Sequence, residues 1–175
     1  YEVDVSPSHI DKDFRLGNAI MSKLPLEHVA DVYYPFPDFE LRFKNGNLAT
    51  TRHDKMVQIY KYGPFMICNT QMLPLEIFGY NYSEGPGKQL ASKIEEILID
   101  NLSEPVIFCG DCNCNFPEQV YPTLINGLNL HDVLPKVFTR PSLKDRSRSP
   151  DHIFVSNEFK CTDSQVLEVN ADHYL

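Results

Sequence analysis

Short apolar runs separated by clusters of turn-forming residues are the main pattern along this chain. Runs of this length and composition are typical of β-strands. They cover residues 18–21, 29–34, 56–60, 65–68, 106–109, 153–155 and 166–169. Alternating polar and apolar positions lead up to Gly63-Pro64, and another apolar run follows at once, so we expect an antiparallel hairpin there.

Two segments show the one-turn spacing of apolar residues that an amphipathic helix requires. After Pro86, residues Leu90, Ile94 and Leu98 recur on one face while charged residues occupy the other. The second segment, 118–127, is shorter and ends in a glycine, as helices often do. A single apolar stripe implies packing against a sheet, so we expect an α+β fold rather than a doubly wound parallel sheet.

Length and composition favour one domain. With 175 residues and 42% hydrophobic content, the chain can bury one core but is short for two, and we predict a single domain over residues 1–175. No apolar run approaches the length that crosses a bilayer. The formal charge of −8 opposes nonspecific attraction to a phosphate backbone, so small phosphorylated substrates suit the chain better than bulk duplex DNA.

Five cysteines, an odd number, lie partly within apolar runs, which favours free thiols and a cytoplasmic or other reducing compartment. Cys109, Cys112 and Cys114 are close together, but no second ligand pair follows at zinc-finger spacing. We therefore interpret them as core and loop thiols. The start at Tyr1 has neither an initiator Met nor signal-peptide features, which indicates a cut through a longer chain.

Polar residues that suit phosphoester chemistry stand at the ends of predicted strands. A buried run ends in Gly-Asp-Cys-Asn, which projects Asp111 and Asn113 into a loop, Asp151 stands at a strand entrance, and Asp172 and His173 follow the last run. Carboxylates can hold a hard divalent cation, and a protonated His can bind a phosphate oxygen. Taken alone, Gly-Asp-x-Asn is equally an Asx turn that closes a strand, so both interpretations stay open.

Four motifs, in this order, resemble the endonuclease/exonuclease/phosphatase superfamily. They are Gly17-Asn18-Ala19-Ile20-Met21-Ser22-Lys23-Leu24-Pro25-Leu26, Gly110-Asp111-Cys112-Asn113, Asp151-His152-Ile153-Phe154-Val155-Ser156 and Ala171-Asp172-His173. The resemblance implies two packed, mostly antiparallel β-sheets flanked by helices, a four-layer α/β/β/α sandwich. It also implies that the chain carries the C-terminal two-thirds of such a domain, with the first two family motifs, including a metal-binding Glu, upstream of Tyr1.

The resemblance assigns roles to the motif residues. Asp111 would orient or deprotonate the attacking water and bind the metal together with Asp172, while Asn113 would position the scissile phosphate. His173 would contact the phosphate in the transition state, with Asp151 as its carboxylate partner. Mg²⁺ would be the usual ion, with Mn²⁺ as an alternative.

Three further positions are candidate substrate-binding residues. Gln71 stands where most members of the superfamily end a strand as Asn-Thr-His-Leu, and Gln donates hydrogen bonds but supplies no positive charge. Lys88 sits where many members carry Arg, at a predicted helix N-terminus that can attract phosphate, although a solvated Lys is the more ordinary interpretation. Arg146 belongs to the basic segment 136–151, which is either a solvated connection or a phosphate grip.

Two functions fit this sequence. The first is a Mg²⁺-dependent hydrolase of phosphodiester or phosphomonoester bonds, in which an activated water attacks in line on a nucleic acid, a nucleotide or a phospholipid headgroup. The second is a catalytically weak or inactive member of the same fold that acts as a binding or interaction module. Gln71 favours the second slightly, whereas the joint presence of the five motif residues favours the first.

Overall fold

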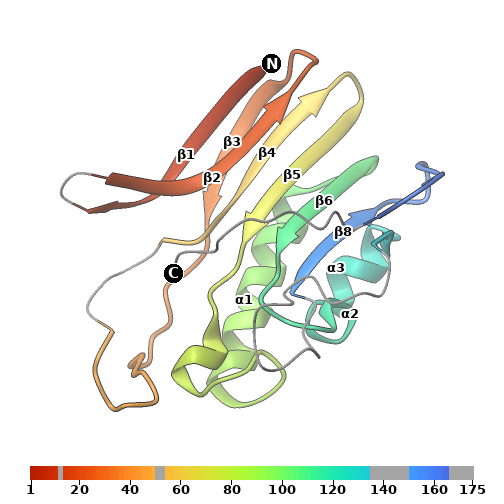
Figure 1. Ribbon diagram of the computed structural model, residues 1–175. Helices are drawn as coiled ribbons and strands as arrows, with labels where there is room; N and C mark the ends of the chain where they lie inside the picture. Colours follow the sequence, from red (N-terminus) through yellow and green to blue (C-terminus); the bar gives the residue numbers. More distant parts are fainter. Residues whose placement is uncertain (12–13, 50–53, 135–149, 166–175) are drawn as a thin grey trace.

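The computed structural model describes residues 1–11, 14–49, 54–134 and 150–165. Within them, eight strands form two sheets (Figure 1). The smaller sheet is an antiparallel hairpin of β1 (Glu2–Asp11) and β2 (Phe14–Ser22). The larger sheet has six strands in the order β3-β4-β5-β6-β8-β7, so neighbours in this sheet are not always neighbours in sequence.

All but one of the strand pairs in the larger sheet are antiparallel. The exception is the pair of β5 and β6, which run parallel because the helix α1 connects them. The six strands are β3 (Glu27–Tyr33), β4 (Met56–Tyr62), β5 (Phe65–Gln71), β6 (Val106–Asp111), β7 (His131–Asp132) and β8 (Asp151–Val155). The predicted hairpin is confirmed as β4 and β5, which turn at Gly63-Pro64 and pair Tyr62 with Phe65.

The main helix, α1 (Gly85–Asn101), packs on one face of this sheet through the predicted stripe. Its residues Leu90, Ile94 and Leu98 are buried in the same core as Ile59 of β4 and Phe108 of β6. Burial of each large aliphatic side chain contributes about 1.5–3 kcal/mol, and this stripe therefore fixes α1 to the sheet.

The predicted helix over 118–127 is two helices, α2 (Pro117–Val120) and α3 (Pro122–Gly127). Pro122 has no N–H to continue the first helix, and it disfavours the helical conformation at the residue before it. Tyr121 accordingly leaves the helical region, with φ −124° and ψ 54°. A short 3₁₀ helix, η1 (Leu75–Phe78), follows β5.

The smaller sheet covers the other face of β4 and β5, and this interface is polar. The Asn69 side chain donates a hydrogen bond to the Ala19 carbonyl (3.1 Å), and Gln58, fully buried, donates one to the Ser6 hydroxyl (2.9 Å). Buried amides need such partners, because an unpaired one costs about 1–3 kcal/mol. The α+β sandwich of two sheets is thus confirmed, and the described elements supply three of its four expected layers.

The predicted strand over 166–169 lies outside the described residues, and a single domain over 1–175 stays a prediction. Among the described helices, none combines the length and the apolar character needed to cross a membrane.

Candidate active site

Three polar residues stand in one row where three neighbouring strands meet the same edge of the larger sheet. Gln71, the last residue of β5, pairs with Asp111 at the end of β6, and Asp111 pairs with Asp151 at the start of β8. Residues in register on adjacent strands point to the same face of a sheet. All three side chains are half-buried. This edge of the sheet therefore presents one carboxamide and two carboxylates that solvent still reaches.

The turn after β6 depends on Gly110, which has a φ of +137°. A Cβ atom at this position would lie 2.8 Å from the Thr70 carbonyl carbon and 2.9 Å from the Thr70 nitrogen, and closer still to the Thr70 carbonyl oxygen. Only glycine permits both that conformation and that approach to β5. The glycine therefore sets where Asp111 is held relative to Gln71.

Asp111 and Asn113 form an Asx turn at the end of β6, and this turn lies at the candidate site. The Asn113 amide donates to Asp111 Oδ1 (2.8 Å), and Asn113 itself has a φ of +49°. The Asn113 side chain donates to the Met72 carbonyl (2.7 Å), which fixes the orientation of its carboxamide. The turn thus holds a carboxylate and an amide in fixed positions beside each other.

Cys112, between them, is a structural residue. Its backbone N–H donates to the Pro150 carbonyl (2.8 Å), and this bond ties the loop to the start of β8. Burial raises the pKa of the Cys112 thiol well above its usual value, and nearby charges including Asp111 and Asp151 raise it further. The residue stays a neutral thiol, in keeping with the interpretation of these cysteines as core and loop thiols.

His152, the residue after Asp151 in β8, hydrogen-bonds to the same loop. Its Nδ1 lies 2.7 Å from Asp132 Oδ2 and its Nε2 lies 3.1 Å from the Cys114 carbonyl oxygen. Burial acts to lower the pKa of His152, but the hydrogen bonds to Asp132 and Cys114 outweigh it and the pKa is raised overall. Because both partners are acceptors, the imidazolium satisfies both. The sequence holds no local signal for this pair, since twenty residues separate its members.

Lys55 is a site residue that the sequence analysis missed. It is half-buried, and its Nζ donates to Gln71 Oε1 at 2.6 Å. Burial lowers the pKa of Lys55, and the charge of Asp111 acts in the opposite direction. The signal was present in the predicted hairpin: counting back from the Gly63-Pro64 turn places the residues just before β4 beside the end of β5.

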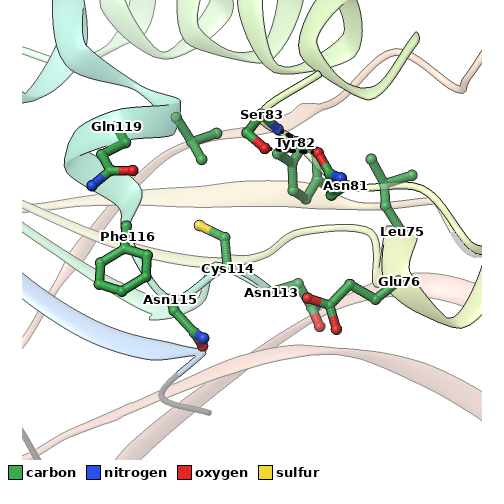
Figure 2. Close-up of a pocket in the computed structure, with 11 residues that line it drawn as sticks. Leu75, Glu76, Asn81, Tyr82, Ser83, Asn113, Cys114, Asn115, Phe116 and Gln119 are labelled. Atoms are coloured by element: carbon green, nitrogen blue, oxygen red, sulfur yellow. Dashed lines mark hydrogen bonds between the residues drawn. The ribbon is translucent and has the colours of Figure 1, made fainter. Parts of the chain in front are cut away.

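A hollow adjoins Asn113 on the side of η1 and α2 (Figure 2). In this view Glu76 lies near Asn113 on one side, and Phe116 and Gln119 lie at the other. Among the described lining residues, neutral polar groups dominate, Phe116 is 56% exposed, and Glu76 is the carboxylate. The lining residues are Leu75, Glu76, Asn81, Tyr82, Ser83, Asn113, Cys114, Asn115, Phe116, Gln119 and Val120.

The other predicted site residues are Asp172, His173, Arg146 and Lys88. Asp172, His173 and Arg146 lie outside the described residues. Lys88 lies in the first turn of α1 and is exposed.

The carboxylates of the row are suitable oxygen donors for a divalent cation. In the described part of the chain, no group of three or more His, Cys, Asp or Glu side chains is placed to hold a metal ion. However, Asp111 and Asp151 face each other on adjacent strands. Like charges placed directly opposite repel, and hard carboxylate oxygens suit Mg²⁺, so the residues present fit part of a Mg²⁺ site.

The match to a family model identifies the class of protein. Residues 5–173 match the model of the Endonuclease/Exonuclease/phosphatase family, so the chain belongs to this family of phosphoester hydrolases. No curated protein gives a match.

Two solved structures show the same fold at low sequence identity, and a third is similar to the chain with a lower TM-score. An endonuclease/exonuclease/phosphatase family protein from Bacteroides thetaiotaomicron is 18% identical, with a TM-score of 0.51, over 89% of this chain and 59% of that one. The corresponding protein from Bacteroides vulgatus is 13% identical, with a TM-score of 0.51, over 89% and 64%. The human Nocturnin catalytic domain is 17% identical, with a TM-score of 0.49, over 89% and 60%. The chain thus spans less than two thirds of the length of each of these structures.

Proposed function

We propose that the protein is a divalent-metal-dependent hydrolase that cleaves a phosphodiester or phosphomonoester bond by in-line attack of water. The observation that carries the proposal is the row of Gln71, Asp111 and Asp151, with Asn113 locked beside it. Family membership supports the reaction class, and this row supports the view that the chain itself contributes to the chemistry. A purely structural role would not place two carboxylates opposite each other.

In this proposal Asp111 orients the attacking water and accepts its proton. Asn113 positions the scissile phosphate, since its carboxamide is already oriented by the Met72 carbonyl. His173, with Asp151 as its carboxylate partner, donates a hydrogen bond to the phosphate or to the leaving group.

Asp111 and Asp172 would hold Mg²⁺, or Mn²⁺, at this edge of the sheet. When bound, the cation supplies neutralisation of the negative charge on the phosphate oxygens. The opposed carboxylates of Asp111 and Asp151 give the site the negative charge that attracts such an ion.

The hollow beside Asn113 supports a substrate with a neutral, hydrogen-bonding group next to the scissile phosphate. Among the described residues that line it, none is Lys or Arg, so this part of the hollow offers no cation to a second phosphate. Side-chain amides suit the edge of a base or a sugar, and the exposed Phe116 suits a flat ring. We therefore place nucleotides and nucleic-acid ends ahead of multiply phosphorylated headgroups among the candidate substrates.

The test is hydrolysis of bis-para-nitrophenyl phosphate and para-nitrophenyl phosphate in Mg²⁺ and in Mn²⁺. The protein is to be expressed as these residues and also with any coding sequence that precedes Tyr1. Asp111→Asn should lower kcat at least about 100-fold, as expected for loss of a general base, and His173→Ala should have a similar effect. Asp100→Asn, which removes an exposed carboxylate on α1, should leave the rate unchanged.

The second candidate function is a phosphate-binding module without catalysis, and Gln71 is the observation that favours it, since it brings no charge of its own. Under this alternative, no substrate would be hydrolysed with either metal, and Asp111→Asn would change phosphate binding but no rate. Equal hydrolysis by wild type and Asp111→Asn, or hydrolysis that persists in chelator, would refute the proposed enzyme.

A further inference from the structure

Lys55 is held in a setting that packing alone does not explain. It lies at the residue before β4, half-buried beside the end of β5. Its backbone is fixed, because the Lys55 carbonyl accepts a hydrogen bond from the Tyr34 amide (2.8 Å). The long side chain is therefore directed from a rigid strand end rather than from a free loop.

The partner of the Lys55 ammonium is a neutral amide. Its Nζ donates to Gln71 Oε1 (2.6 Å), and it forms no ion pair with any carboxylate of the described residues. Partial burial of an ammonium costs free energy unless an anion or several acceptors compensate it. Among the described residues, Gln71 uses one of its three N–H donors, so part of the charge is left for other partners.

The Lys55 ammonium lies beside the row formed by Gln71, Asp111 and Asp151. Gln71 pairs in register with Asp111, and Asp111 is the carboxylate whose charge acts on Lys55. The described residues that line the hollow beside Asn113, in contrast, include no cationic side chain. Positive charge at the described part of this site therefore comes from the β4 side.

We propose that Lys55, positioned by Gln71, binds a phosphoryl oxygen of the substrate and neutralises the charge that develops there. The Gln71 carboxamide accepts one ammonium hydrogen and so holds the charge at the row, and the other N–H donors bind the ligand oxygen. Gln71 is thus a positioning residue and Lys55 the binding residue. The ligand class is a phosphate monoester or diester, or free phosphate. The catalytic role of Lys55 rests on the proposed phosphoesterase function, whereas its binding of phosphate does not.

Charge-changing variants of Lys55 test the binding role. Lys55→Met removes the charge at nearly constant shape, and Lys55→Gln removes it but keeps a polar, hydrogen-bonding end, so the two variants together separate the loss of charge from the loss of polarity. Both should lower kcat/KM about 100-fold, the effect typical of a lost oxyanion donor, while Lys55→Arg should stay within about tenfold of wild type. Lys61→Met, on an exposed lysine of β4, is the matched control and should change nothing.

The positioning role of Gln71 is tested by coupling. Gln71→Leu should weaken the affinity for inorganic phosphate and lower kcat/KM, and its effect should disappear in the Lys55→Met background. Such non-additivity is expected for two residues that act as one unit. Additive effects of the two variants would overturn the positioning role.

Calorimetric titration with inorganic phosphate, in the absence of any reaction, separates this inference from the proposed function. If wild type binds phosphate and Lys55→Met and Lys55→Gln do not, Lys55 is confirmed as the anion-binding residue whether or not hydrolysis is found. If wild type hydrolyses substrate and the Lys55 variants match Lys61→Met in rate and phosphate affinity, the inference is wrong and the function stands. Absence of both hydrolysis and phosphate binding in wild type would overturn both.

Discussion

Replacement of Gly110 by alanine is the sharpest test of how the fold positions the candidate site. The new methyl carbon would lie 2.8 Å from the Thr70 carbonyl carbon, where carbon atoms normally pack at about 3.5–4.0 Å. The obstacle is the backbone of the adjacent strand, so no side-chain rotation can relieve the overlap. Either β5 and β6 separate, or the residue abandons its φ of +137°.

If the strands separate and the residue keeps its φ, the cost has two parts. Alanine at such a φ costs about 1–3 kcal/mol, and separation of the strands near Gly110 breaks about two ladder hydrogen bonds worth about 1 kcal/mol each. We therefore expect Gly110→Ala to lower the free energy of unfolding by about 3–5 kcal/mol. This is a large part of the 5–15 kcal/mol that is typical of a whole domain.

The assay is urea denaturation followed by far-ultraviolet circular dichroism, because the chain has no Trp to serve as a fluorescent reporter. Gly127→Ala is the matched control: no atom lies within 4 Å of its added methyl group, and we expect a change of less than about 1 kcal/mol. A Gly110→Ala protein as stable as the control would show that β5 and β6 are not held as close as described, and the row of polar residues would lose its basis.

Two further predictions concern the charged pairs. Because the pKa of His152 is raised, its stabilising contribution is fully present below the unfolded pKa of about 6.5 and is lost as pH rises through the folded pKa. In acid the contribution is lost again, when Asp132, whose pKa is lowered, takes up a proton. His152→Phe should therefore lower the free energy of unfolding by about 1.5–3 kcal/mol near pH 5.5 and by less near pH 8.5, and an equal loss at both values by urea denaturation would exclude a charged pair. Asp151→Asn relieves the repulsion with Asp111 and should raise stability in chelator by about 0.2–1 kcal/mol, but it should reduce the stabilisation that Mg²⁺ gives in thermal melts; a loss of stability in chelator would contradict the repulsion argument.

Local patterns in the sequence were sufficient to predict the hairpin and the main helix. The Gly63-Pro64 turn joins two strands of alternating or apolar character, and the stripe of α1 repeats along successive turns of one helix, so each is specified by nearby residues. β1 escaped prediction because its apolar residues alternate with charged ones and it contains Pro7, which gives no clear signal of burial. β7 has only two residues and depends on the bond between Asp132 and His152, which is a nonlocal contact.

The candidate site was only partly predictable for the same reason. The sequence indicates that Asp111, Asn113 and Asp151 stand at strand ends, but it does not state which strands are adjacent. That information lies in the order β5-β6-β8, where α1 makes the first pair parallel and the second pair antiparallel. Lys55 shows the opposite case, since the hairpin register alone would have placed it beside Gln71.

The strand order also explains why stability and function should be in conflict at this edge. Because β5 and β6 run parallel and β8 runs against them, the ends of two strands and the start of the third meet at one place. The register there puts Asp111 between a neutral Gln71 and a like-charged Asp151, which lowers stability in the absence of a cation. A neutral residue at position 151 would remove this repulsion. An edge that keeps both carboxylates, with the Lys55 ammonium on the far side of Gln71, is instead suited to bind a cation and an anionic ligand together.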